Sequence, residues 1–114
     1  MVVPKFTIWD TTKILYFEKN FKMKKMNMVY AFQGNQANFT SAIFSHYEFA
    51  LEWIKKHKLS GILTEYPLDY PIYEWAIDNG YFKPKNDHHT NSNFIGHFTS
   101  VRQKHWHFVN GNTE

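Results

Sequence analysis

The sequence predicts an α+β fold in which a largely antiparallel sheet carries two helices packed on one face. Residues 44–82 contain start and stop signals for a helix, a short strand and a second helix, in that order. Short apolar runs bounded by turn residues flank this segment on both sides, which gives the order β, β, α, β, α, β, β. We expect residues 1–114 to form a single domain, with a core at 28–109 and an N-terminal extension at 1–27.

The first predicted elements are strands. Apolar runs at 6–9 and 14–17 predict an N-terminal hairpin, and a lysine-rich connector follows at 18–27. Residues 28–32 form an apolar run closed by polar turn residues, so they predict a strand, and residues 39–44 predict its partner.

A helix is predicted to follow Ser45. Ser45 and Glu48 have the spacing of a capping box, in which each side chain accepts a hydrogen bond from the other residue's backbone N–H. Apolar residues then recur at helical spacing, and Ser60-Gly61 predicts the helix end. The residues expected to share the buried face are Phe49, Ala50, Trp53, Ile54 and His57.

The second half of the chain continues the pattern. Residues 61–66 predict a strand that ends at a proline. Asp69 is the predicted cap of a second helix, with Pro71 in the first turn and Gly80 just past the end. The apolar stripe expected on this helix is Ile72, Tyr73, Ala76 and Ile77.

The remaining residues predict a polar loop and two closing strands. The loop follows Pro84, and the strands are expected at 94–98 and 104–109. Residues 110–114 are rich in small polar side chains and are expected to fray.

The composition favours a dense core together with exposed rings. The chain is 43% hydrophobic and 19% aromatic, with 11 Phe, 7 Tyr and 4 Trp. Each aromatic side chain buries roughly 150–250 Å², so this supply exceeds what a domain of this size easily hides. Some rings are therefore expected at the surface, where aromatic residues favour contacts with a partner.

Several protein classes are excluded by what the sequence lacks. There are no cysteines, which rules out disulfides, thiolate zinc sites and a cysteine nucleophile. The N-terminus has no apolar signal region, and no apolar stretch approaches the roughly 18 residues of a membrane span. A cytoplasmic protein without a membrane partner is the expectation.

The central segment also resembles a known family. Its closest stretches are LSGILTEYP at 59–67, YEWAI at 73–77 and GYF at 80–82. Across about residues 28–108 the chain is similar to a small bacterial single-domain family of unknown function. The resemblance implies a bacterial cytosolic domain, and it implies no catalytic residue.

The charges are separated along the chain, although the net charge is only +3. Four lysines cluster at 19–25, whereas residues 59–82 contain no Lys or Arg and hold four carboxylates. Together with the tyrosines and tryptophan nearby, these carboxylates predict an acidic, aromatic-rimmed surface that would dock on a basic protein. The expected contact residues are Tyr66, Tyr70, Glu74, Trp75 and Asp78, supplemented by Glu65 and Asp69, with Tyr73 also at the rim. The alternative is a solvated acidic face in which Asp69 only caps a helix.

The histidines offer an alternative site. His105 and His107 alternate on a predicted strand and so share a face, and His97 is expected on a neighbouring strand. Three imidazoles that converge in this way would bind zinc or iron. The simpler interpretation is a polar sheet face without a metal, and we expect no cofactor.

The lysine cluster at 19–25 contains Phe21, and lysines with an interleaved ring can bind nucleic acid. A flexible, solvated connector is the preferred interpretation, because charge runs are usually solvated.

The sequence therefore favours a small non-enzymatic protein-binding module. It contains no nucleophile elbow, no catalytic triad spacing and no phosphate-binding loop. A toxin-neutralising immunity protein, which would dock on its toxin by shape and charge, is the example that fits these traits. A histidine-based metal protein or enzyme and a nucleic-acid-binding accessory protein are the alternatives, and the oligomeric state stays open.

Overall fold

The computed structural model describes residues 27–114, so the hairpin predicted at 6–17 lies outside the described residues. The predicted α+β class is confirmed, since a five-stranded antiparallel sheet has the strand order β2-β1-β3-β4-β5. The elements are β1 (Met28–Gly34), β2 (Ala42–Phe44), α3 (Tyr47–Lys56), β3 (Gly61–Pro67), α4 (Ile72–Asp78), a 3₁₀ turn η1 (Asp87–Thr90), α5 (Ser92–Gly96), β4 (His105–Val109) and β5 (Asn112–Thr113).

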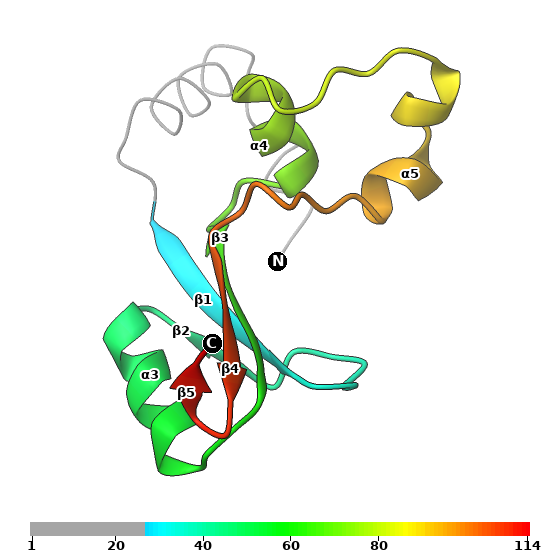
Figure 1. Ribbon diagram of the computed structural model, residues 1–114. Coiled ribbons are helices and arrows are strands. Elements are labelled where there is room, and N and C mark those ends of the chain that lie inside the picture. Colours follow the sequence, from blue (N-terminus) through cyan, green and yellow to red (C-terminus); the bar gives the residue numbers. More distant parts are fainter. Residues whose placement is uncertain (1–26) are drawn as a thin grey trace, which may run out of the picture.

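The sheet core lies where alternate residues of three strands meet helix α3 (Figure 1). Leu63 on β3 pairs with Phe32 on β1 and with Trp106 on β4, so these side chains form one row on the same face. Ala50 and Ile54, one turn apart on α3, are fully buried against this row. We refer to Phe32, Ala50, Ile54, Leu63 and Phe108 as the sheet core.

The start of α3 differs from the prediction. His46, and not Ser45, is the N-cap and makes no side-chain cap bond, and the Ser45 hydroxyl lies 2.8 Å from the His46 ring nitrogen Nδ1. The predicted capping box with Glu48 is therefore wrong. Phe49 was also expected in the buried face, but it is 55% exposed and lies against the His46 ring.

Only the first of the two predicted helices packs on the sheet core. Helix α4 lies beyond the end of β3, far from α3, and its buried Tyr73 belongs to a second cluster (Figure 1). The Tyr73 ring is 6.0 Å from Phe82 and 5.5 Å from Phe98, centroid to centroid. We refer to Tyr73, Phe82, Phe94 and Phe98 as the α4–α5 cluster. The expectation that both helices share one sheet face is corrected accordingly.

Asp69 does not cap α4. Pro71 occupies the N-cap position, and Asp69 lies in the preceding turn with a φ of 62°. The proline ring disfavours the helical conformation of the residue before it, which keeps Tyr70 outside the helix, and α4 begins at Ile72, directly after its N-cap Pro71.

The strand predicted at 94–98 does not form, because residues 94–96 belong to helix α5 and residues 97–98 follow it outside any strand. The Asn91 side chain accepts a hydrogen bond from the Phe94 backbone N–H at 2.8 Å, which caps α5. Asn86 caps η1 in the same way through the His89 N–H. Asparagine capping thus overrides the apolar run that suggested a strand.

The last residues are ordered into a hairpin rather than frayed. Val109 pairs with Asn112, and the two residues between them, Asn110 and Gly111, have φ values of 51° and 88°. Positive φ at both central residues is the requirement of the two-residue hairpin turn that Asn-Gly favours. The Gly111 N–H also donates to the Leu59 carbonyl at 2.8 Å, which ties the hairpin to the end of α3.

Candidate functional site

Four of the predicted contact residues lie on α4 or just before it. Glu74 and Asp78 are exposed one turn apart, Trp75 is half-buried between them in sequence, and Tyr70 precedes the helix. With Tyr81 they form what we call the α4 surface: Tyr70, Glu74, Trp75, Asp78 and Tyr81.

Tyr70 is fixed to this surface by a hydrogen bond. Its hydroxyl donates to the Asp78 carboxylate. Burial, this hydrogen bond and the charges of Asp78 and Glu74 raise the pKa of Tyr70 to about 12. The phenol therefore stays neutral and holds the Asp78 carboxylate in one position.

Trp75 and Tyr81 form the aromatic part of the surface. Their ring centroids are 5.4 Å apart, and the Arg102 guanidinium lies 5.2 Å from the Tyr81 ring centroid. Tyr81 is 49% exposed. The surface therefore presents two carboxylates beside a partly exposed aromatic pair.

Tyr81 and Arg102 were missed by the sequence analysis. Helix α4 ends in a Schellman motif, in which the Gly80 N–H donates to the Ile77 carbonyl and the Tyr81 N–H to the Ala76 carbonyl. This motif turns the chain back and brings the residue after the glycine onto the helix. The Asn79-Gly80 exit signal was the clue to Tyr81, whereas no local signal pointed to Arg102.

Of the other predicted contact residues, Asp69 is exposed in the turn directly before Tyr70, whereas the rest lie elsewhere. Glu65 and Tyr66 are neighbours on β3 and point to opposite sheet faces, as strand residues must. Glu65 accepts a hydrogen bond from the Tyr30 hydroxyl at 2.9 Å on the α3 side. Tyr73, expected at the rim, is only 8% exposed and belongs to the α4–α5 cluster.

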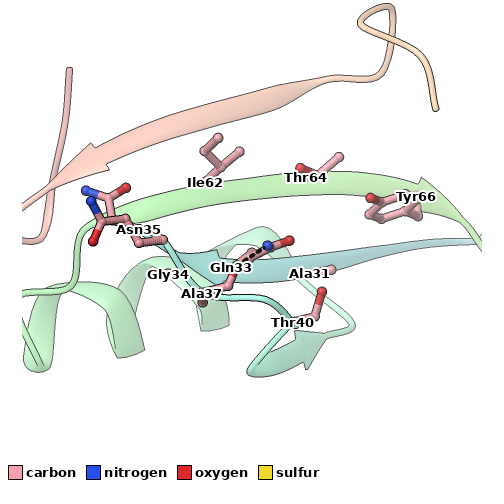
Figure 2. Close-up of a pocket in the computed structure, with 10 residues that line it drawn as sticks. Ala31, Gln33, Gly34, Asn35, Ala37, Thr40, Ile62, Thr64 and Tyr66 are labelled. Carbon is pink, nitrogen blue, oxygen red and sulfur yellow. Dashed lines mark hydrogen bonds between the residues drawn. The ribbon is translucent and has the colours of Figure 1, made fainter. Parts of the chain in front are cut away.

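Tyr66 instead lines a hollow of about 280 Å³ on the sheet face opposite α3 (Figure 2). Its floor contains Ala31 and Thr64, two small residues that pair directly across β1 and β3. The β1–β2 loop forms one wall and is held by the Gln33 side-chain N–H, which donates to the Ala37 carbonyl at 2.7 Å. The lining is neutral: Ala31, Gln33, Gly34, Asn35, Gln36, Ala37, Thr40, Ile62, Thr64 and Tyr66. The hollow thus offers hydrogen-bonding groups without charge.

The histidines proposed as metal ligands do not converge. His105 and His107 lie side by side on β4, with ring centroids 5.2 Å apart, but His97 follows α5 instead of lying on a neighbouring strand. Within residues 27–114, no three His, Asp or Glu side chains form a group that could hold a metal ion. The lysines at 19–25 lie outside the described residues.

Comparison with known proteins identifies a family for this chain. A family described as "Domain of unknown function (DUF7710)" matches residues 29–114. No curated protein and no solved structure gives a significant match. Between residues 27 and 114, no helix has the length and apolar character needed to cross a bilayer.

Proposed function

The chain belongs to the DUF7710 domain family, and because that family has no stated function, we propose from the surface chemistry that the protein is a non-enzymatic protein-binding module. The α4 surface is the proposed contact site. The observation that supports it is the juxtaposition of exposed Glu74 and Asp78 with the partly exposed rings of Trp75 and Tyr81.

Aromatic and charged side chains have different roles at a protein interface. A few anchor residues, among which Trp, Tyr and Arg are enriched, provide most of the binding energy at protein interfaces, and charges at the rim direct association. Trp75 is held by its contact with Tyr81, and Asp78 by its hydrogen bond from Tyr70, so binding would order few free side chains. A basic protein surface is the matching partner, whereas the exposed carboxylates would repel nucleic acid.

We propose further that the partner is a bacterial toxin. The module would neutralise this toxin in the cytoplasm by covering its surface, through both shape and charge. A toxin gene adjacent to the gene for this chain would support this identity, and its absence from the neighbourhood would remove the support. The general protein-binding proposal does not depend on that outcome.

The test is co-purification from the native host, followed by binding measurements with the purified partner. The informative variant is E74K/D78K, which reverses both exposed charges on α4. The matched control is E48K/E52K, because Glu48 and Glu52 are also exposed and one turn apart, but on α3. We expect the α4 variant to weaken binding at least about tenfold at low salt and the α3 variant to leave it unchanged.

A second variant separates the aromatic contribution. Trp75→Ala is expected to cost about 2 kcal/mol or more of binding free energy, as a truncated interface anchor does. Unfolding curves show whether each variant keeps its fold. The proposal is overturned if no protein co-purifies stoichiometrically, or if E74K/D78K binds the partner as tightly as the wild type does.

A further inference from the structure

The hollow on the sheet face opposite α3 is lined by an unusual concentration of side-chain amides (Figure 2). Four of the six residues at 33–38 carry an amide, and three of these line the hollow: Gln33, Asn35 and Gln36. Two threonines, Thr40 and Thr64, add their hydroxyls. Amides and hydroxyls both donate and accept hydrogen bonds, so the hollow can satisfy a ligand that has groups of both kinds.

The loop that carries these amides is fixed by its own hydrogen bonds. The Asn35 N–H donates to the Ser60 carbonyl at 3.0 Å, which ties the loop to the turn before β3. The Ala37 N–H donates to the Gly34 carbonyl at 3.0 Å and closes the turn between them. Because the wall is already ordered, a ligand that binds there would immobilise little additional backbone.

Gln36 adopts a conformation that its residue type does not favour. Its φ is 62°, in the left-handed region where glycine is at ease and most other residues are strained. Strained positions of this kind cluster at ligand-binding sites, where the surrounding structure maintains them for function. Here the strain places an amide side chain in the lining of the hollow, at a position where a glycine would carry none.

The chemistry of the lining selects the kind of ligand. The sequence has no Asp, Glu, Lys or Arg between Lys25 and Glu48, and the charged residue of β3, Glu65, points to the α3 side. A charged ligand would lose hydration there, because the described residues that line the hollow offer no counter-charge. An apolar ligand would leave the amides without hydrogen-bond partners. A neutral ligand rich in hydrogen-bonding groups is therefore favoured.

We propose that the hollow binds a neutral pyranose sugar. The hydroxyls of a sugar ring match the amides and threonine hydroxyls of the lining, and its C–H face can pack on an aromatic ring. Ile62, Thr64 and Tyr66 alternate along β3, so the Tyr66 ring lies on the same face as the hydrogen-bonding groups. The volume of about 280 Å³ lies just below the roughly 300–1,000 Å³ of sites for drug-sized molecules, which suits a single sugar ring.

This site is separate from the proposed protein-binding function. The residues that line the hollow and those of the α4 surface have no member in common. Sugar binding can therefore be measured with the chain alone, and its failure would leave the proposed contact through α4 unaffected.

NMR titration of the isotope-labelled full chain tests the proposal. The probes are glucose, galactose, mannose and N-acetylglucosamine, each added to about 50 mM, since a small ligand in an open site is expected to bind with a millimolar Kd. We expect at least one sugar to shift the amide signals of residues 33–40 and 62–66 saturably, and uridine and N-acetyl-alaninamide, two neutral ligands of other classes, to bind more weakly. The proposal is overturned if none of the sugars shifts these signals, or if either comparison ligand binds more tightly than every sugar.

Two loop variants test the role of the amides. Gln36→Gly removes a lining amide and suits the positive φ, so it should weaken sugar binding about fivefold while making the protein more resistant to urea. Asn38→Ala is the matched control, because this neighbouring amide lies outside the lining, and it should bind the sugar as the wild type does. Thr64→Phe fills the floor and should abolish binding, with circular dichroism to verify its fold. A Gln36→Gly variant that binds as tightly as the wild type, or an equal loss in Asn38→Ala, overturns the proposal even if Thr64→Phe unfolds.

Discussion

At the scale of single residues, Gly61 marks a position where two strands of the sheet lie too close for a side chain. A Cβ atom at this position would lie 2.3 Å from the Gln33 carbonyl oxygen and 2.8 Å from the Phe32 ring. The Gln33 carbonyl belongs to the backbone of the neighbouring strand β1, as does the Gly34 Cα atom, which would lie 2.8 Å from the same Cβ, so these two atoms can move only if the strand pairing changes. Gly61 therefore permits the contact between β1 and β3 as well as ending the preceding turn.

We expect Gly61→Ala to destabilise the fold by about 3 kcal/mol, through overpacking against a fixed backbone. Gly96→Ala is the control, because a Cβ there meets nothing within 4 Å and the residue lies in α5. The control is expected to be neutral or stabilising by up to about 1 kcal/mol. Urea unfolding compares the two, and equal stabilities would contradict the proposed role of Gly61.

Tyr70 gives a pH-dependent prediction. Its pKa is raised from 10.0 to about 12 in the folded protein, so the unfolded chain loses this proton first as the pH rises. The stabilisation is complete below pH 10 and is lost as the pH approaches 12. The difference in unfolding free energy between the wild type and Tyr70→Phe should therefore shrink from pH 9 to pH 11.5. A difference that does not change with pH would show that Tyr70 is not stabilised as a neutral phenol.

At the scale of elements, both long helices end in the same motif with different residues. After α4, Gly80 adopts a φ of 77°, and after α3 the equivalent residue is Lys58, with a φ of 53°. The Lys58 N–H donates to the Lys55 carbonyl, and the Leu59 N–H to the Ile54 carbonyl, as in the Schellman motif of α4. A lysine in this left-handed conformation carries a steric cost that glycine avoids.

Lys58→Gly is accordingly expected to stabilise the protein by about 0.5–1 kcal/mol. Gly80→Ala is the reciprocal change and is expected to destabilise it by a similar amount. Thermal and urea unfolding measure both effects. The two substitutions should change the free energy of unfolding in opposite directions. A Lys58→Gly variant that is less stable than the wild type would contradict this account.

The elements also show how far local sequence signals extend. Strands β1, β3 and β4 were predicted because their apolar runs are bounded by clear turn residues. The errors arose where one polar side chain decides the conformation: Asn91 caps a helix inside an apolar run, and Asn110-Gly111 forms a hairpin turn. The Asn-Gly pair is a known hairpin signal, so β5 was predictable, and the two-residue turn also fixes its register with β4.

At the scale of the whole molecule, the buried sheet core and the half-buried α4–α5 cluster share no residue. The sheet core joins β1, β3 and β4 to α3, while the α4–α5 cluster is built from residues 73–98. Because each cluster has its own packing, local opening of one does not require opening of the other.

Phe82→Ala tests this independence, since the Phe82 ring lies 4.9 Å from Phe98 and 5.7 Å from Phe94. We expect amides in α4 and α5 to exchange faster, with a loss of roughly 2–4 kcal/mol in local opening free energy, while β1 and β3 keep their protection. Phe49→Ala, at an exposed position, is the control and should change neither region. Loss of protection in the sheet of the Phe82 variant would show a single cooperative unit.

The candidate site was predictable in part. Glu74, Trp75 and Asp78 come together because they belong to one helix, and helical spacing can be read from the sequence. Glu65 and Tyr66 were grouped with them by proximity in the chain, although neighbours on a strand point apart. Arg102 reaches Tyr81 only through tertiary folding, which no local pattern records.

The route between β3 and β4 has a practical consequence. The Glu65 N–H donates to the Lys104 carbonyl at 2.9 Å, so the chain leaves the sheet and returns to it at nearly the same point. Residues 68–103 therefore leave the sheet and return to it with their two ends already held close together, and a short turn could replace them without stretching either strand. In evolution or in protein engineering, this segment could therefore be exchanged for another one while the hydrogen bond between Glu65 and Lys104 and the sheet itself stay in place.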